Sequence, residues 1–370
     1  MSNTLGSGRR SFLKMAGAAA ALTSAGMASG ATVDSMQATT AGAANNPSDC
    51  IPVMKVGALG LDYSFWQLCA STLYPNGRLE GTSILRMRPA YVWDKNKQLA
   101  QGFADKWGCE VVDRYDAMVG KVDAVLVGDL VLAPWQHLLL RPYIQAGIPS
   151  FLQRHWSDNL VHLDEMLNLA AKHNTPLMAT VPFEHNDQGD TAPRQLETAG
   201  EVMAAFATAE IPDVPHFHIP YLMMKILGYD VDSISMKTDN IQKTGYLSSD
   251  YYYPANDSRK PFVLSMQGAG TDLFSFNIMC RIANVSSHIP AHANSTVRFL
   301  PQLIDIQKTF EKRELYQPLD VIRKKFQCLQ TAFYSNSERN GAPVKVGSVP
   351  ADWSIPAWKP NEYSAADFKS

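Results

Sequence analysis

The segment 55–67, KVGALGLDYSFWQ, has the residue types of a turn that could hold a phosphate group. An apolar strand containing Gly57 leads to Gly60, as in the G-x-G-x-x-G turn of dinucleotide-binding βαβ units. Gly60 takes the first glycine place of that pattern, Asp62 the second and Phe65 the third. A carboxylate about 4 Å from a phosphate costs roughly 1 to 4 kcal/mol. The segment therefore predicts a dinucleotide-type turn whose phosphate binding is weakened.

Asp94 follows a second apolar segment, 89–93, at the place where a carboxylate would accept hydrogen bonds from the ribose of NAD. The same carboxylate would repel the 2′-phosphate of NADP. An aspartate here could equally be the N-cap of a helix predicted over 96–107, and the sequence leaves both roles open. The predicted cofactor-binding residues are Gly57, Gly60, Asp62 and Asp94.

A metal site is the other chemistry that the residue types allow. His216 and His218 would point the same way on an extended segment, and Glu184 with His185 could complete a site of zinc or manganese type. Such spacing is common by chance, so no metal site is predicted. The five cysteines have no CxxC spacing and predict neither a zinc cluster nor a disulfide framework.

Apolar strands that alternate with amphipathic helices are expected to position these residues. In the helix over 96–107, Leu99, Phe103 and Trp107 recur at i, i+4 and i+8. Strands spaced by helices form a parallel sheet with helices on both faces, so the first half predicts a Rossmann-type α/β domain. Its predicted strands are 54–61, 89–93, 109–115, 122–128, 149–152 and 176–183, and its other helices are 135–146 and 159–173.

The second half changes to strands that follow one another through polar turns. Strands are predicted over 232–237, 245–253 and 261–267, with helices over 220–228 and 319–335. This order is typical of an α+β domain with a mostly antiparallel open sheet. Alternation along the second strand directs Tyr252 to one face of the sheet and Tyr251 with Tyr253 to the other, so at most part of this aromatic run could stack on a sugar.

The N-terminus predicts a twin-arginine export signal. Arg9 and Arg10 precede a mildly apolar Ala/Gly run and small residues near position 30. We therefore expect a signal peptide over 1–30, a flexible linker over 31–50 and a mature chain that the twin-arginine export machinery delivers to the periplasm or the medium. The expected domains are the Rossmann-like domain over 51–183, the second domain over 184–348 and a tail over 349–370.

Composition excludes several classes of protein. The 370 residues carry a formal net charge of −2 and are 46% hydrophobic, which is ordinary for a globular protein. There is no basic excess for nucleic acid. No segment of the mature chain is apolar over the length that a membrane span requires. Assembly into a homo-oligomer stays open.

Three segments resemble the glucose–fructose oxidoreductase and inositol dehydrogenase family, Gfo/Idh/MocA. They are VDAVLVG with the following helix that ends in QAGIP, HIPYLMMKILGYDVDSISMK, and LQTAFYSNSERNGAPVKV. Together with the order of elements, the resemblance covers roughly residues 53–346. It implies NAD or NADP as cofactor and hydride transfer to or from a sugar or polyol.

The resemblance also implies four catalytic residues. The family's Glu-Lys-Pro motif, whose lysine donates to the reacting oxygen, falls on Gln153, Arg154 and His155. Arginine keeps the charge but cannot exchange a proton at neutral pH, whereas His155 could titrate in the useful range. His218 matches the family's proton-shuttling histidine by its distance to the glycine at 228, and Tyr221 stands where an aspartate would lie nearby.

Two functions remain open from the sequence. One is an exported oxidoreductase that acts on a sugar or polyol. The other is a catalytically silent relative that binds carbohydrate without a working cofactor site, which the altered turn and the two altered catalytic motifs favour. For Arg154 and His155 the structural alternative is an exposed loop at the sheet edge, and for His218 it is a structural histidine at the start of a helix.

Overall fold

The computed structural model describes residues 53–61, 86–209, 218–238, 247–257, 259–268, 273–290, 295–356 and 362–368. All of them belong to one compact unit, residues 51–370. The predicted export signal lies outside the described residues. So do Asp62, Phe65 and His216, and the expectations for these three residues stay predictions.

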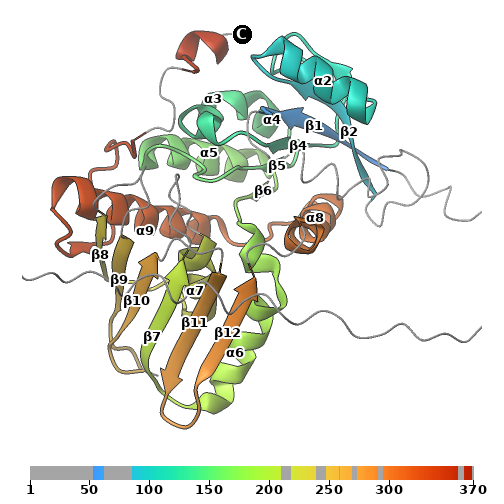
Figure 1. Cartoon of the computed structure of the whole chain (residues 1–370). Coiled ribbons are helices and arrows are strands. Elements are labelled where there is room, and N and C mark those ends of the chain that lie inside the picture. Colours follow the sequence, from blue (N-terminus) through green and yellow to red (C-terminus); the bar gives the residue numbers. More distant parts are fainter. Residues whose placement is uncertain are drawn as a thin grey trace, which may run out of the picture. The chain divides into compact units, whose positions relative to one another are not determined.

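The first half forms a six-stranded parallel sheet in the order β3-β2-β1-β4-β5-β6 (Figure 1). This confirms the Rossmann-type α/β prediction. The strand order reverses between β1 and β4, and in sheets of this type the ligand crevice lies beyond the carboxyl ends of the strands at such a point. The strands are β1 (Met54–Leu59), β2 (Met87–Trp93), β3 (Glu110–Val111), β4 (Ala124–Val127), β5 (Ser150–Phe151) and β6 (Leu177–Met178).

Two helices of this half begin at polar caps. Asn96 caps α2 (Lys97–Trp107) and Asn159 caps α5 (Leu160–His173). The single helix predicted over 135–146 is wrong, because that stretch forms η2 (Leu130–Trp135), α3 (Gln136–Leu139) and α4 (Arg141–Gln145). Pro142 in the first turn of α4 has no backbone N–H to donate to a carbonyl four residues earlier, so the hydrogen bonding of a continuous helix is interrupted there.

The second half forms a seven-stranded sheet in the order β12-β11-β7-β10-β9-β8-β13. Only the β10–β7 pair is parallel among the described pairs, so the predicted mostly antiparallel sheet is confirmed. Tyr251 and Tyr253 are buried and Tyr252 is not, as alternation predicts. The strands are β7 (Val202–Ala209), β8 (Ser233–Thr238), β9 (Leu247–Tyr253), β10 (Phe262–Gly268), β11 (Leu273–Cys280), β12 (Val285–Pro290) and β13 (Val344–Lys345).

Helices tie the two sheets together. The helix α8 (Ser295–Lys312) comes from the second half of the chain, but its buried face packs against Met54, Val56 and Leu126 of the parallel sheet. The remaining helices are η3 (Pro182–His185), α6 (Asp187–Ala199), α7 (His218–Leu227), α9 (Leu319–Glu338) and η4 (Ala365–Phe368). Among the described residues, no helix combines the length and the apolarity needed to cross a bilayer.

Candidate active site

Gly60 directly follows β1 and has a left-handed backbone conformation. Its φ is +76°, in the left-handed region that favours glycine, and its N–H donates to the carbonyl of Trp93 at 2.9 Å. A Cβ at this position would lie 2.4 Å from Leu132 Cδ1 and 2.8 Å from Asp129 Cβ. Backbone conformation and space therefore both require glycine here, as the first place of a dinucleotide turn does.

Gly57 has a different environment. It lies inside β1, where a Cβ would meet Met118 Sδ at 2.9 Å and Val125 Cγ1 at 3.1 Å. The structure thus separates Gly57, which lets the loop before β4 pack on the strand, from Gly60, which shapes the turn. Asp62 and Phe65, the residues expected to weaken phosphate binding, lie outside the described residues.

Asp94 connects the carboxyl ends of β1 and β2. It is buried, and its Oδ2 accepts a hydrogen bond from the N–H of Leu61 at 2.7 Å while Oδ1 accepts one from the N–H of Asn96 at 2.7 Å. The N-cap alternative is wrong, because the Asn96 side chain accepts from the N–H groups of Gln98 and Leu99. The structure brings Gly60 and Asp94 to neighbouring strand ends, where a dinucleotide's diphosphate and ribose lie in folds of this type.

Arg154 and His218 meet although they come from different halves of the chain. Arg154 follows β5, His218 begins the described part of α7, and both are buried. Arg154 Nη1 lies 3.4 Å from Nδ1 of His218 and is in closer contact with Nε2. Because a guanidinium has only donors, the nitrogen that faces it presents its lone pair. The expectation of an exposed loop is wrong, because Arg154 and His155 are both buried. The Gln136 side chain holds the backbone just before them, since its Nε2 donates to the carbonyl of Gln153 and its Oε1 accepts from the N–H of Gln153.

His155 is not the titrating group that its position suggested. Burial, and then the charge of Arg154, lower the pKa of His155 to about 3. The imidazole is therefore neutral across the neutral range, which corrects the expectation that it titrates there. Its ring packs edge-on against Phe333 of α9 at 6.2 Å between centroids.

Tyr221 is fully buried one helical turn after His218. Its ring stacks on Trp156 with centroids 4.8 Å apart and planes 14° apart. Burial raises the pKa of Tyr221 well above its usual range, so the phenol stays protonated at neutral pH. Tyr221 thus packs beside the Arg154–His218 pair.

A buried ion pair under this stack was not predicted from the sequence. The ammonium of Lys325 in α9 donates to Glu184 Oε1 at 2.6 Å and lies 4.8 Å from the centroid of Trp156 and 5.0 Å from that of Tyr221. Burial lowers the pKa of Lys325, and the Glu184 carboxylate opposes that shift. A usable signal existed, because Lys325 falls on the apolar face of its helix, three residues after Ile322 and four before Leu329.

Glu184 and His185, which were considered as metal ligands, have protein partners. His185 Nδ1 lies 2.8 Å from Asp305 Oδ2 and its Nε2 lies 2.8 Å from Thr180 Oγ1. Glu184 pairs with Lys325 and also accepts the N–H of Val181 at 2.9 Å. These contacts account for both side chains as parts of the junction between the two sheets.

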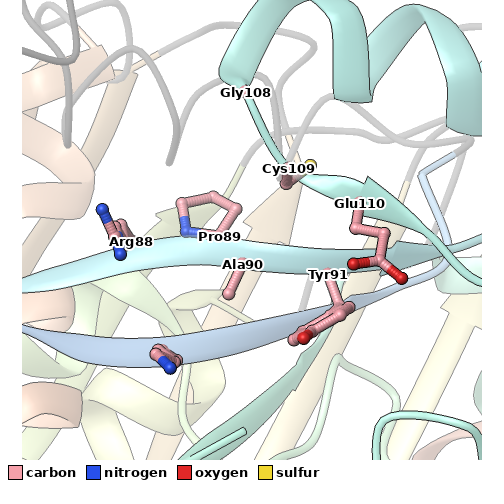
Figure 2. Close-up of a pocket in the computed structure, with 8 residues that line it drawn as sticks. Arg88, Pro89, Ala90, Tyr91, Gly108, Cys109 and Glu110 are labelled. Carbon is pink, nitrogen blue, oxygen red and sulfur yellow. The ribbon is translucent and has the colours of Figure 1, made fainter. Parts of the chain in front are cut away.

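A cavity of about 480 Å³ lies over β2 and β3, and Lys55 and Arg88 near the amino ends of β1 and β2 line part of it (Figure 2). Lys55 and Arg88 are the second residues of their strands, so at about 3.3 Å per residue Lys55 lies roughly 16 Å from Gly60. The cavity is therefore distinct from the carboxyl-end crevice. Burial raises the pKa of Cys109, which also lines the cavity, to about 11, so the thiol stays protonated. Its full lining is Lys55, Arg88, Pro89, Ala90, Tyr91, Gly108, Cys109 and Glu110.

Comparisons of sequence find no matching protein-family model and no matching curated protein. Solved structures do match over most of the chain. The scyllo-inositol dehydrogenase of Lactobacillus casei, solved with NAD(H) and scyllo-inositol, has a TM-score of 0.65 at 12% identity over 80% of this chain and 100% of its own. The myo-inositol 2-dehydrogenase of Lactobacillus plantarum gives 0.63 at 12% identity with the same coverage.

A third match is GenD2 of gentamicin A biosynthesis, solved with NAD, with a TM-score of 0.63 at 13% identity over 83% of this chain and 100% of its own. Each match covers at least 80% of this chain and so takes in both the parallel sheet and the second, mostly antiparallel sheet. The fold expected from the resemblance is therefore confirmed: this chain has the two-domain fold of the Gfo/Idh/MocA oxidoreductases.

Proposed function

We propose that the chain is an exported oxidoreductase that transfers hydride between a nicotinamide cofactor, NAD or NADP, and a sugar or polyol. The observation that carries the proposal is the arrangement of Gly60 and Asp94 at adjacent strand ends, with the Arg154–His218 pair at the carboxyl end of β5. The carboxyl ends of parallel strands lie at one edge of the sheet, where ligands of such folds bind, so these residues lie along the same edge. The NAD(H) and scyllo-inositol of the Lactobacillus casei enzyme support the ligand classes.

The residues fit the cofactor in part. The left-handed φ of Gly60 fits the first place of a diphosphate-binding turn, and Asp94 would hold the adenosine ribose and discriminate against a 2′-phosphate. When bound, the cofactor supplies hydride acceptance and donation. The chain's own part of the chemistry is to hold the substrate oxygen and to move one proton.

Arg154 and His218 can divide that work. A fixed guanidinium charge would orient the reacting oxygen and stabilise negative charge on it. Oxidation of an alcohol also releases a proton. His218 could accept it on the nitrogen that now faces Arg154, once the guanidinium has turned to the substrate oxygen. Neither the buried phenol of Tyr221 nor the weakly basic His155 suits that role at neutral pH. Of the four predicted catalytic residues, His218 is the best proton acceptor.

The second candidate is the catalytically silent carbohydrate-binding relative. It is favoured by the loss of an exchangeable proton at the lysine place of the Glu-Lys-Pro motif, where Arg154 stands, and by the neutral His155 beside it. The two candidates differ in nucleotide binding and turnover.

Nicotinamide binding tests the proposal. We expect chain 51–370 to be stabilised against thermal unfolding by NAD or NADP, since a ligand at 100 times its Kd adds about 2.7 kcal/mol to the free energy of unfolding. The measurement is the melting temperature with each dinucleotide, followed by absorbance of the reduced cofactor with a panel of inositols and sugars. No stabilisation by either dinucleotide, together with stabilisation by a sugar, would support the silent relative instead.

Export is proposed from Arg9 and Arg10. Replacing both with lysine should leave the full-length chain in the cytoplasm of a bacterium that has twin-arginine export, because the pair is the feature that this route recognises. Cell fractionation and immunoblotting measure the result, and Lys14→Arg serves as the control. A processed chain that still reaches the exported fraction of the double variant would exclude this route.

A further inference from the structure

The C-terminal segment 362–368 packs over the carboxyl ends of the parallel sheet. Phe368 stacks on Trp135 with centroids 6.0 Å apart and planes 23° apart, and meets Tyr115 edge-on at 5.6 Å. It also lies 6.2 Å from Trp93, the last residue of β2. We call Trp93, Tyr115 and Trp135 the aromatic slot. In Figure 1 this C-terminal turn, in red, lies beside α3, which it contacts.

Polar contacts fix the segment in that position. The hydroxyl of Tyr115 donates to the carbonyl of Phe368 at 2.9 Å. The ammonium of Lys95 donates to the carbonyl of Glu362 and to Asp367 Oδ2, each at 2.9 Å. Tyr363 and Phe368 are only 5% and 6% exposed, so the segment buries two aromatic side chains against the domain. The segment therefore contacts the domain as a bound peptide would, with apolar side chains at the centre of the contact and charged groups at its edge.

The aromatic slot lies on the adenosine side of the crevice. Asp94 stands between Trp93 and Lys95, and in dinucleotide-binding sheets the acidic residue at this strand end holds the adenosine ribose. The flat rings of the slot suit a planar heterocycle, since aromatic faces favour offset stacking. A cavity of about 200 Å³ adjoins it, lined by Trp93, Lys95, Lys97, Asp113, Arg114, Tyr115 and Asp367.

We propose that segment 362–368 and the adenosine half of a nicotinamide dinucleotide compete for the aromatic slot. The inference rests on the proposed function, because it takes the crevice to be a dinucleotide site. Binding of the dinucleotide then requires the segment to leave. If the segment is docked in about 90 to 99% of molecules, the apparent affinity for the dinucleotide is about 10- to 100-fold weaker than that of the open crevice.

The test compares nucleotide binding by the full mature chain and by the double variant Tyr363→Ala with Phe368→Ala. Isothermal titration with NAD⁺, with AMP and with nicotinamide mononucleotide separates the two halves of the cofactor. We expect the double variant to bind NAD⁺ and AMP about 10- to 100-fold more tightly than the wild type and to bind nicotinamide mononucleotide equally. Ala366→Ser, an exposed change in the same turn, is the matched control and should leave all three affinities unchanged.

Hydrogen exchange of the unmodified chain gives a second readout that does not depend on how the double variant folds. Saturating NAD⁺ should increase exchange of the amides in 362–368, because the docked segment is released. Equal NAD⁺ affinity of the two chains, or unchanged exchange with NAD⁺ bound, would overturn the competition and leave the proposed function standing. Tighter AMP binding by the variant without NAD⁺ binding by either chain would keep the competition and overturn the proposed function. Absence of all nucleotide binding would overturn both.

Discussion

Replacing His218 with alanine is expected to lower kcat for polyol oxidation by about two to four orders of magnitude, the range that general acid–base catalysis contributes. The reason is that Arg154 cannot take a proton, Tyr221 holds its own, and burial lowers the pKa of His155 to about 3. NAD⁺ affinity should change little, because His218 is the first residue of α7 and is not one of the residues proposed to bind the cofactor, Gly60 and Asp94. Steady-state kinetics over a range of pH, with NAD⁺ titration of the same preparations, measure both quantities.

Two comparisons make this expectation specific. His173→Ala changes a partly exposed histidine at the end of α5 and should leave kcat unchanged. Added imidazole should restore part of the lost rate to His218→Ala, which a purely structural histidine would not allow. A kcat within about threefold of the wild type would exclude His218 as the principal proton acceptor.

Replacing Lys325 with methionine is expected to lower the free energy of unfolding by about 3 to 5 kcal/mol, the usual effect of removing one partner of a buried ion pair. Lys325 is fully buried and Glu184 is 1% exposed, so the variant would leave a carboxylate without its cation inside the domain junction. Methionine has a similar length, which keeps the contacts with Trp156 and Tyr221. Urea unfolding monitored by circular dichroism measures the difference.

The double variant Lys325→Met with Glu184→Gln is the matched control. It should recover most of the loss, because no buried charge is left, whereas Ala in place of Lys325 would also leave a cavity. A single Lys325→Met variant as stable as the wild type would mean that water or another group compensates Glu184. That result would remove the ion pair as a determinant of the junction.

The single variant Glu184→Gln gives a pH dependence of known sign. Burial already lowers the pKa of Lys325, and Glu184 opposes the shift, so removing the carboxylate lowers that pKa further. A group whose pKa is lowered on folding takes up protons more readily in the unfolded chain, and stability is therefore lost as pH falls. We expect the deficit of Glu184→Gln relative to the wild type to be smaller at about pH 9 than at about pH 7.

Much of the fold followed from the sequence because its periodicities are local. The apolar run before Gly60, the helix over 96–107 and the alternation of Tyr251, Tyr252 and Tyr253 all depend on neighbours in the chain. Three strands of the second sheet, β7, β11 and β12, were not predicted, although Phe274, Phe276 and Ile278 alternate along β11. The break in the helix predicted over 135–146 was missed although Pro142 within it signals one.

The site depended far more on tertiary structure. The sequence by itself determined which groups are present: a glycine at 60, a carboxylate at 94, and an arginine in place of an exchangeable lysine at 154. Only the folded chain decided that Asp94 binds two backbone N–H groups, that Arg154 meets His218, and that Lys325 lies under Trp156. Apart from the hydrogen bond between Asp94 and Asn96, these contacts join residues tens of positions or more apart, and the burial that sets the pKa of His155 comes from the elements packed around it. The spacing of residues along the chain predicts neither these contacts nor this burial.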